Sequence, residues 1–335
     1  MLIVWIQFAA SVVLIWLAGS RLSRYGDIIA EKTGLGRTWI GVILLATVTS
    51  LPELATGVSA VTLAKAPDLA VGDALGSCVF NLMIVTLLDF LQREESVFTR
   101  ASQGHILSAG FGVILIGLVG FSLSLQQAWP QVSIGHIGPS TPIILLLYAV
   151  AMRTVFRYER RQRAAAVEEA VEQYGHITFR RAVVGYSASA LVVAATGTLL
   201  PFVGERLAAV MGWQQTFVGT LFLAFATSVP EAVVTIAAVR LGALDLAVSN
   251  LLGSNLFDIA IIAIDDFCFL PGPLLAHVSP MHVVSSLSAL MMTGVTIVGL
   301  LYRPPTRLFR AVGWSSLLLF LLYLLNTYVL YLYRG

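Results

Sequence analysis

Two glutamates stand in the middle of apolar stretches, where a leucine would be far easier to bury. Glu231 is the only acidic residue between positions 207 and 239, and Glu53 lies in the same local pattern earlier in the chain. The patterns are TSLPE, which ends at Glu53, and TSVPE, which ends at Glu231. A carboxylate buried among apolar groups is costly unless it is paired or binds a metal ion. The first hypothesis is therefore that both acids hold a positively charged ligand.

The residues before each glutamate supply further oxygen atoms. A proline cannot donate a backbone hydrogen bond and crowds the carbonyl four residues earlier, so a helix is expected to break there. The freed carbonyls would join four hydroxyl side chains, those of Thr49, Ser50, Thr227 and Ser228. An all-oxygen cluster suits hard cations such as Ca²⁺ or Na⁺ rather than zinc or copper. The alternative, a structural kink beside a protonated acid, is weakened by the presence of two copies.

A second pair of motifs follows each glutamate. The segments DLAVGDALGSCVFN (68–81) and DLAVSNLLGSNLFD (245–258) match at 8 of 14 positions. Residues spaced by four share one face of a helix, so each segment carries a polar stripe. The stripes are Asp73, Ser77 and Asn81 in the first segment and Asn250, Ser254 and Asp258 in the second. Gly72, Gly76 and Gly253 are expected to let a neighbouring backbone approach closely.

The composition of the chain is that of an integral membrane protein. Of its 335 residues, 58% are hydrophobic and 11% are charged, with a mean hydropathy of +0.87, whereas soluble domains carry about 25% charged residues. Continuous apolar runs of about 20 residues can cross a bilayer as helices. We expect an all-α polytopic membrane protein with ten transmembrane helices, at 2–20, 38–64, 69–91, 104–123, 140–157, 182–203, 214–239, 244–264, 279–301 and 312–333.

The distribution of basic residues predicts the orientation. With the N-terminus outside, every Lys and Arg except Lys65, Arg206 and Arg334 falls in an inner loop, as cytoplasmic loops favour basic residues. Both termini are therefore expected on the outer side, and the compact chain suits a prokaryotic inner membrane. A net charge of +2 gives no reason to expect nucleic acid, and no protein partner is evident besides the lipid bilayer.

The two matching halves predict an inverted repeat. Each half holds five expected spans, an odd number, so the second half enters the membrane from the opposite side. We assign residues 1–157 to the first five-helix repeat, 158–180 to a cytosolic linker and 181–335 to the second repeat. Inverted repeats with interrupted helices are typical of secondary transporters that bind substrate near the midplane.

These motifs resemble those of the sodium/calcium exchangers of the cation/calcium antiporter superfamily. The resemblance is carried by TSLPE, GSCVFN, TSVPE and GSNLFD and by the five-plus-five layout. It implies that Glu53 and Glu231 bind calcium, beside the backbone carbonyls of Thr49 and Thr227. It also implies flanking sodium sites, to which Ser50, Ser77, Ser228, Ser254 and the carbonyls of Ala46 and Ala224 contribute. The side chains of Asn81 and Asp258 would complete the centre.

Two positions differ from the pattern that the resemblance implies. Asp73 stands where such repeats usually carry asparagine, as Asn250 does here, and Cys78 stands where the second repeat has Asn255. Asp73 and Asn250 are assigned to a pathway beside the centre. Three further acids near span ends, Asp89, Asp265 and Asp266, are expected to meet water, and His105 and His136 are expected at the membrane interface.

The functional hypothesis is a secondary active antiporter that exchanges Na⁺ for Ca²⁺ by alternating access, with both ions as substrates and without a cofactor. An H⁺-coupled or K⁺-dependent calcium antiporter on the same fold stays open, since buried carboxylates can carry protons. A passive cation channel is less consistent with paired charged sites. An enzyme is not expected, because the chain has neither HExxH nor GxSxG.

Overall fold

The computed structural model describes residues 1–33, 48–92, 95–129, 132–164, 177–303, 307–308 and 312–333. Nearly all of these residues are helical, as expected for a chain whose backbone polar groups must be satisfied within lipid. The described strands are β1 (Arg307–Leu308) and β2 (Val312–Gly313), which pair antiparallel near the start of the last helix.

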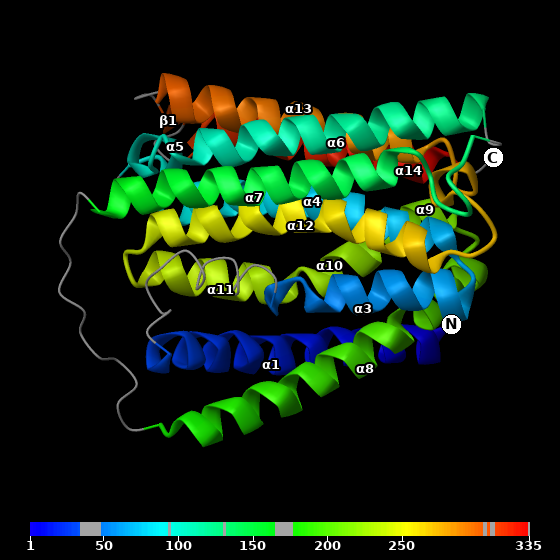
Figure 1. Ribbon diagram of the computed structural model, residues 1–335, viewed down its shortest axis with the longest axis horizontal. Helices are drawn as coiled ribbons and strands as arrows, with labels where there is room; N and C mark the ends of the chain where they lie inside the picture. Colours follow the sequence, from blue (N-terminus) through cyan, green and yellow to red (C-terminus); the bar gives the residue numbers. More distant parts are fainter. Residues whose placement is uncertain are drawn as a thin grey trace.

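The helices form two series of similar order (Figure 1). The first series is α1 (Leu2–Lys32), α3 (Leu51–Ser59), the π-helix η1 (Ala60–Ala64), α4 (Pro67–Leu91), α5 (Val97–Arg100), α6 (His105–Ala128) and α7 (Ser140–Ala164). The second series is α8 (Phe179–Met211), α9 (Gln215–Val218), the π-helix η2 (Gly219–Leu223), α10 (Ala224–Thr227), α11 (Val229–Arg240), α12 (Leu244–Cys268), the 3₁₀ helix η3 (Leu274–Ala276), α13 (His282–Tyr302) and α14 (Trp314–Leu332).

Eight of the described helices are long and apolar enough to cross a membrane, and a bent pair, Gln215–Thr227 with Val229–Arg240, gives a ninth candidate. Leu51–Ala64 is a shorter apolar helix. It covers the end of the expected span 38–64, whose start lies outside the described residues. The helices α1 and α8 run further than the expected spans 2–20 and 182–203. The protein is a multi-pass helical membrane protein.

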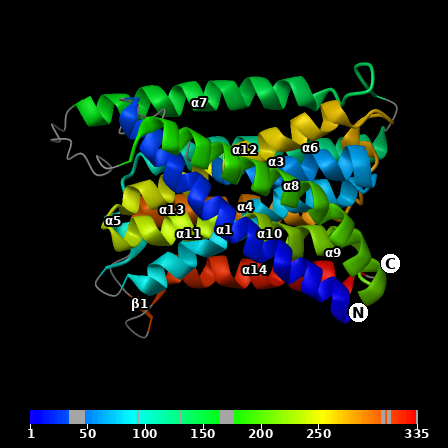
Figure 2. The same cartoon turned by 90° about the horizontal axis from the view of Figure 1, so that it is seen from below.

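The centre of the bundle is formed by α4 and α12. These two are the most deeply buried of the candidate spans, and they pack against each other. The pair α1 and α8 lies along one side, below α3 and α11 in Figure 1, while α7 and α14 lie on opposite sides of the bundle in Figure 2. The outer helices expose large apolar side chains, such as Leu191, Val298 and Tyr328, as a surface in contact with lipid requires.

The glycines of α4 allow the close backbone approach that their spacing predicts. A Cβ atom placed on Gly72 would lie 3.1 Å from the Cα of Gly219, and one on Gly76 would lie 2.7 Å from the Cα of Thr220. Both contacts are with η2, the π-helical turn that leads into α10. The small residues therefore bring the broken helix of the second half directly against α4, which positions the residues after the break.

Candidate cation-binding site

Both proline-containing motifs interrupt a helix, as the sequence predicts. The helix α3 begins at Leu51 with Pro52 in its first turn, and α11 begins at Val229 with Pro230 in the same place. The axis bends by 45° between Gln215–Thr227 and Val229–Arg240. The residues at the two breaks, Ser50 and Ser228, have nearly the same conformation, with φ of −86° and −83° and ψ of 14° and 7°. The same local sequence thus produces the same break twice.

Each glutamate lies in the first turn of the helix that begins at the break. The side chains of Glu53 and Glu231 are buried, with exposures of 1% and 0%. The first turn of a helix presents unpaired backbone N–H groups and the positive end of the helix dipole, which favours a negative charge. This position lowers the free-energy cost of an ionised carboxylate without using up both of its oxygens.

The two motifs meet through a reciprocal pair of hydrogen bonds. Ser50 Oγ donates to Glu231 Oε1 at 3.1 Å, and Ser228 Oγ donates to Glu53 Oε1 at 3.2 Å. The side chain of Thr49 also hydrogen bonds to Glu231. Each acid is therefore held by the hydroxyl groups of the opposite half of the chain, and the two carboxylates are neighbours at the centre of the bundle.

The polar stripes of α4 and α12 border this crossing. Ser77 Oγ lies 3.0 Å from Ser228 Oγ, and Ser254 Oγ lies 3.5 Å from Glu231 Oε1. Thr227 Oγ1 donates to Asp73 Oδ1 at 2.9 Å. The hydroxyl groups predicted as ligands are thus within hydrogen-bond reach of a carboxylate or of each other.

Asn81 and Asp258 lie on the same two helices but are engaged differently. Asn81 Nδ2 donates to Asn255 Oδ1 at 3.0 Å, and Asn255 Nδ2 donates to the carbonyl of Cys78 at 3.2 Å. Cys78 Sγ lies 4.0 Å from Asp258 Oδ2, where the thiol is a weak donor. Asn255 therefore joins α12 to α4 beside the centre, a contact that the sequence analysis did not anticipate.

Several buried oxygens of these residues have no hydrogen-bond donor among the described residues. They are Glu53 Oε2, Glu231 Oε2, Asp258 Oδ1, Asn81 Oδ1 and Asp73 Oδ2. Unpaired buried oxygens of this kind carry a large desolvation penalty, which a hard cation would remove because its ligands are oxygens. Within the described ranges, no group of three or more His, Cys, Asp or Glu side chains converges closely enough to hold a metal ion. The hydroxyl and amide oxygens beside the carboxylates are further candidate ligands for a hard cation.

The sequence profile of the sodium/calcium exchanger protein family matches residues 3–157 and 181–330. The chain belongs to the sodium/calcium exchanger family. The inner membrane protein YrbG of Escherichia coli is 24% identical to this exchanger-family chain over 306 residues, which are 90% of this chain and 89% of YrbG.

Solved structures of exchangers share the fold of this family member. The H⁺/Ca²⁺ exchanger CAX superposes with a TM-score of 0.70 at 16% identity, covering 99% of this chain and 85% of CAX. The sodium–calcium exchanger NCX_Mj, soaked with 2.5 mM Na⁺ and 0.1 mM Ca²⁺, superposes with a TM-score of 0.59 at 19% identity, covering 97% of each chain. The family and its structural neighbours are membrane transporters.

Three predicted residues of this exchanger-family chain lie apart from the crossing or cannot be placed. Asn250 Nδ2 donates to Thr235 Oγ1 at 3.3 Å, one turn beyond Glu231 on α11. The carbonyl of Ala224, one turn before the break, accepts a hydrogen bond from the backbone N–H of Ser228 at 3.0 Å. Ala46 lies outside the described residues.

The expectation that Asp89, Asp265 and Asp266 meet water is wrong, since all three are buried. Asp89 accepts hydrogen bonds from Ser96, Val97, Gly313 and Ser316. Asp266 accepts from Gly138, Thr141 and Leu274. These two acids fix the loops that follow their helices, because loop N–H groups near a membrane interface need acceptors. Neither oxygen of Asp265 has a hydrogen-bond partner among the described residues.

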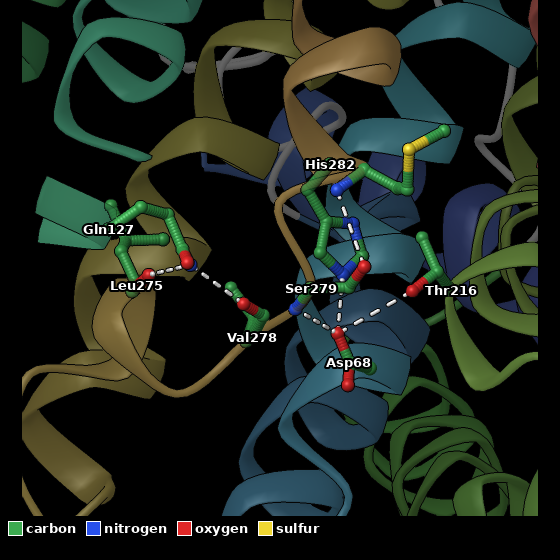
Figure 3. A network of polar contacts seen from close by, with 8 residues as sticks. Asp68, Gln127, Thr216, Leu275, Val278, Ser279 and His282 are labelled. Atoms are coloured by element: carbon green, nitrogen blue, oxygen red, sulfur yellow. Dashed lines mark hydrogen bonds and ion pairs between the residues drawn. The ribbon is translucent and has the colours of Figure 1, made fainter. Parts of the chain in front are cut away.

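Sequence reasoning also missed two matching aspartate–histidine contacts between the halves. Asp68, in the first turn of α4, accepts from the backbone N–H of Ser279 at 2.7 Å and lies 3.0 Å from His282 Nε2 (Figure 3). Asp245, in the first turn of α12, accepts from Ser102 N–H at 2.7 Å and lies 2.8 Å from His105 Nε2.

His105 is buried at the first residue of α6, whereas His136 is partly exposed and lies 3.0 Å from the carbonyl of Phe267. Their place at the membrane interface stays a prediction. The equal spacing of Asp68 to Asp245, Ser102 to Ser279 and His105 to His282 was the available signal.

Proposed function

We propose that this chain is a secondary active antiporter that exchanges Na⁺ for Ca²⁺ by alternating access. The observation that carries the proposal is the crossing of the two breaks, where Ser50 bonds Glu231 and Ser228 bonds Glu53. Within the part of the chain that the structure describes, the crossing leaves one oxygen of each carboxylate without a donor. Membership of the sodium/calcium exchanger family supports the assignment.

We assign the ion-binding residues by their position around this crossing. Glu53 and Glu231 are the shared calcium ligands, and hydroxyl, amide and carbonyl oxygens complete the coordination. The full proposed set is Glu53, Glu231, Asp258, Asn81, Thr49, Thr227, Ser50, Ser228, Ser77, Ser254, Ala46 and Ala224, with Asp73 and Asn250 along the pathway. The unpaired buried oxygens of the four acids and of Asn81 support this assignment.

Charge explains why an ion must be loaded before the site moves. Glu53, Glu231 and Asp258 together carry up to three negative charges in a region of low dielectric constant, where unneutralised charge is costly. One Ca²⁺ or several Na⁺ would neutralise most of it and permit the change between inward-open and outward-open states. Because both ions need the same oxygens, binding of one excludes the other, and that exclusion couples their movements.

The same proposal includes ten transmembrane helices in two inverted repeats, 1–157 and 181–335, joined by the linker 158–180. Matching helix contacts support the repeats. α4 packs on α13 and α14 as α12 packs on α6 and α7, and α3 packs on α8 as α11 packs on α1. From the basic residues we place both termini outside a prokaryotic inner membrane.

The test is Na⁺-driven ⁴⁵Ca²⁺ uptake into proteoliposomes. Glu53→Gln and Glu231→Gln each remove one charge from the centre with little change of shape, and each is expected to reduce uptake to the level of empty liposomes. Glu95→Gln, at an exposed glutamate, is the matched control and should transport as the wild type does. Unchanged uptake in both central variants would contradict the proposal.

The second candidate is an H⁺-coupled calcium antiporter, with K⁺ dependence as a further variant. It is favoured by Asp73, a buried acid with an unpaired Oδ2 that the second half replaces with Asn250. Imposing the Na⁺, K⁺ and pH gradients one at a time distinguishes these couplings. Calcium uptake that follows the pH gradient without Na⁺ would replace the sodium proposal. Flux that grows without saturation would instead indicate a passive channel.

A further inference from the structure

The two halves differ at three positions that lie together. In the second half, Thr235 on α11 accepts a hydrogen bond from Asn250 on α12. The equivalent positions in the first half are Gly57 on α3 and Asp73 on α4. A third difference is Asp265 near the end of α12, where the equivalent residue of α4 is Leu88.

The carboxylate of Asp265 fills the space that the missing side chain of Gly57 leaves. A Cβ atom placed on Gly57 would overlap both carboxylate oxygens of Asp265. Gly57 lies one turn after Glu53 on α3, and Asp265 lies two turns after Asp258 on α12. These two helices pack against each other. Asp265 therefore lies beside the proposed centre, where α3 and α12 pack against each other.

Asp265 has the environment of a ligand rather than of a structural acid. It is fully buried, and neither oxygen has a hydrogen-bond donor among the described residues. Its neighbour in the chain, Asp266, accepts hydrogen bonds from Gly138, Thr141 and Leu274. Two adjacent acids on one helix thus differ completely, and only Asp266 is used to hold a loop.

Asp73 is the other acid of this region. The counterparts of Asp73 and Gly57 in the second half, Asn250 and Thr235, are in hydrogen-bond contact. The equivalent positions of Asp73 and Gly57 place Asp73 on the side of Asp265, and its charge acts on that carboxylate. Asp73 uses Oδ1 to accept from Thr227, while no described residue donates to Oδ2 and the side chain is 1% exposed. Asp73 and Asp265 therefore offer three buried carboxylate oxygens that are unpaired among the described residues. The symmetry-equivalent place has a neutral amide, a hydroxyl and a leucine, from Asn250, Thr235 and Leu88.

We propose that Asp73 and Asp265 form an accessory site for a hard cation, beside Gly57 and next to the centre. Two buried carboxylates repel each other, and a cation with oxygen ligands would remove the repulsion and bind the three oxygens that lack a donor among the described residues. The site lies toward the end of the bundle that carries α9, because Asp73 is in the second turn of α4 and α4 contacts α9 there (Figure 1). The inference rests on the proposed function, because the accessory site adjoins the ion pathway of the proposed antiporter. It lies on one side of that pathway only.

The test measures equilibrium Ca²⁺ binding to the purified full chain in detergent by isothermal titration calorimetry. The background is Glu53→Gln/Glu231→Gln, which removes both shared ligands of the centre. We expect residual binding of one Ca²⁺ per chain in this background. Adding Asp265→Asn should weaken that binding about 10-fold or more, since even residues that only support metal ligands contribute this much.

Leu88→Asn in the same background is the matched control, because it makes the same polar change at the equivalent position of the other half. It should leave the residual binding unchanged. Elution as a single peak in size-exclusion chromatography shows that each variant is folded. If Asp265→Asn does not elute as a single peak, the variant Gly57→Thr/Asp73→Asn/Asp265→Leu takes its place. This variant carries at each position the neutral residue of the equivalent position in the other half, and it should also lose the residual Ca²⁺ binding.

Absence of residual Ca²⁺ binding in the Glu53→Gln/Glu231→Gln background would overturn the accessory site and leave a proton shared by Asp73 and Asp265. Equal residual binding with and without Asp265 would overturn it too. Neither result depends on transport. Failure of Na⁺-driven uptake by the wild type would instead contradict the antiport proposal alone.

Discussion

The two halves of this protein share several of the contacts that join them and differ at a small group of buried residues. The reciprocal contacts Ser50–Glu231 and Ser228–Glu53 are equivalent, and so are the contacts Asp68–His282 and Asp245–His105. Asp89 and Asp266 are a further equivalent pair that fixes loops. Buried differences include Asp73, Cys78, Asn81, Gly57 and Leu88 of the first half, whose counterparts are Asn250, Asn255, Asp258, Thr235 and Asp265.

This distribution has a physical reason. A contact that joins the two halves benefits each of them equally, so a repeated sequence can supply it twice. A transporter must nevertheless distinguish its two sides, and a buried charge present in only one half makes the two ion pathways unequal. Asp73, Asp258 and Asp265 each occur in one half only and keep an oxygen unpaired among the described residues. They are the places where the two halves are not equivalent.

The largest effect is expected for the acids that hold loops. Asp89→Asn and Asp266→Asn each leave buried donors without a charged acceptor, at a cost of about 1–3 kcal/mol per donor left unpaired. Both variants should melt at clearly lower temperature than the wild type, by a similar amount. Asp265→Asn is the internal control, because it removes no hydrogen bond, and it should not lower the melting temperature. A large destabilisation by Asp265→Asn would show that this acid is structural.

A smaller effect is expected at the aspartate–histidine contacts. His105→Ala and His282→Ala each remove one side-chain hydrogen bond between the halves and should lower the free energy of unfolding by about 1 kcal/mol. The loop N–H groups of Ser102 and Ser279 keep their aspartate acceptors in both variants. The two losses, compared by thermal unfolding in detergent, should be alike. A loss of stability in only one of the two variants would show that the two aspartate–histidine contacts are not equivalent.

The smallest effect is expected at the crossing serines. Ser50→Ala and Ser228→Ala remove one hydroxyl each from the glutamates, which corresponds to about 0.5–1.5 kcal/mol. The concentration of Ca²⁺ that half-saturates uptake should rise several-fold in both. Ser20→Ala, whose hydroxyl bonds only to Trp16 within α1, should behave as the wild type. Different shifts for Ser50 and Ser228 would show that the two glutamates do not share one ion equally.

Much of the centre could be predicted from the sequence because its causes are local. A proline after Thr-Ser breaks a helix wherever it occurs, so the breaks before Glu53 and Glu231 follow from five residues each. Glycine at positions 72 and 76 likewise indicates close packing without naming the partner. The expectation for Asp89, Asp265 and Asp266 was wrong, because a position near the end of a span does not reveal whether a loop folds back over it.

The sequence by itself determined that this is a helical membrane protein with two matching halves and two broken helices that each carry a glutamate. These properties depend on hydropathy, on the chemistry of proline and on internal similarity, which need no knowledge of distant contacts. Only the tertiary structure decided that each glutamate is held by a serine of the other half, that Asp266 is satisfied while Asp265 is not, and that Gly57 makes room for the latter. Those outcomes depend on which groups meet across helices, and a buried oxygen is paired or unpaired only once its neighbours are in place.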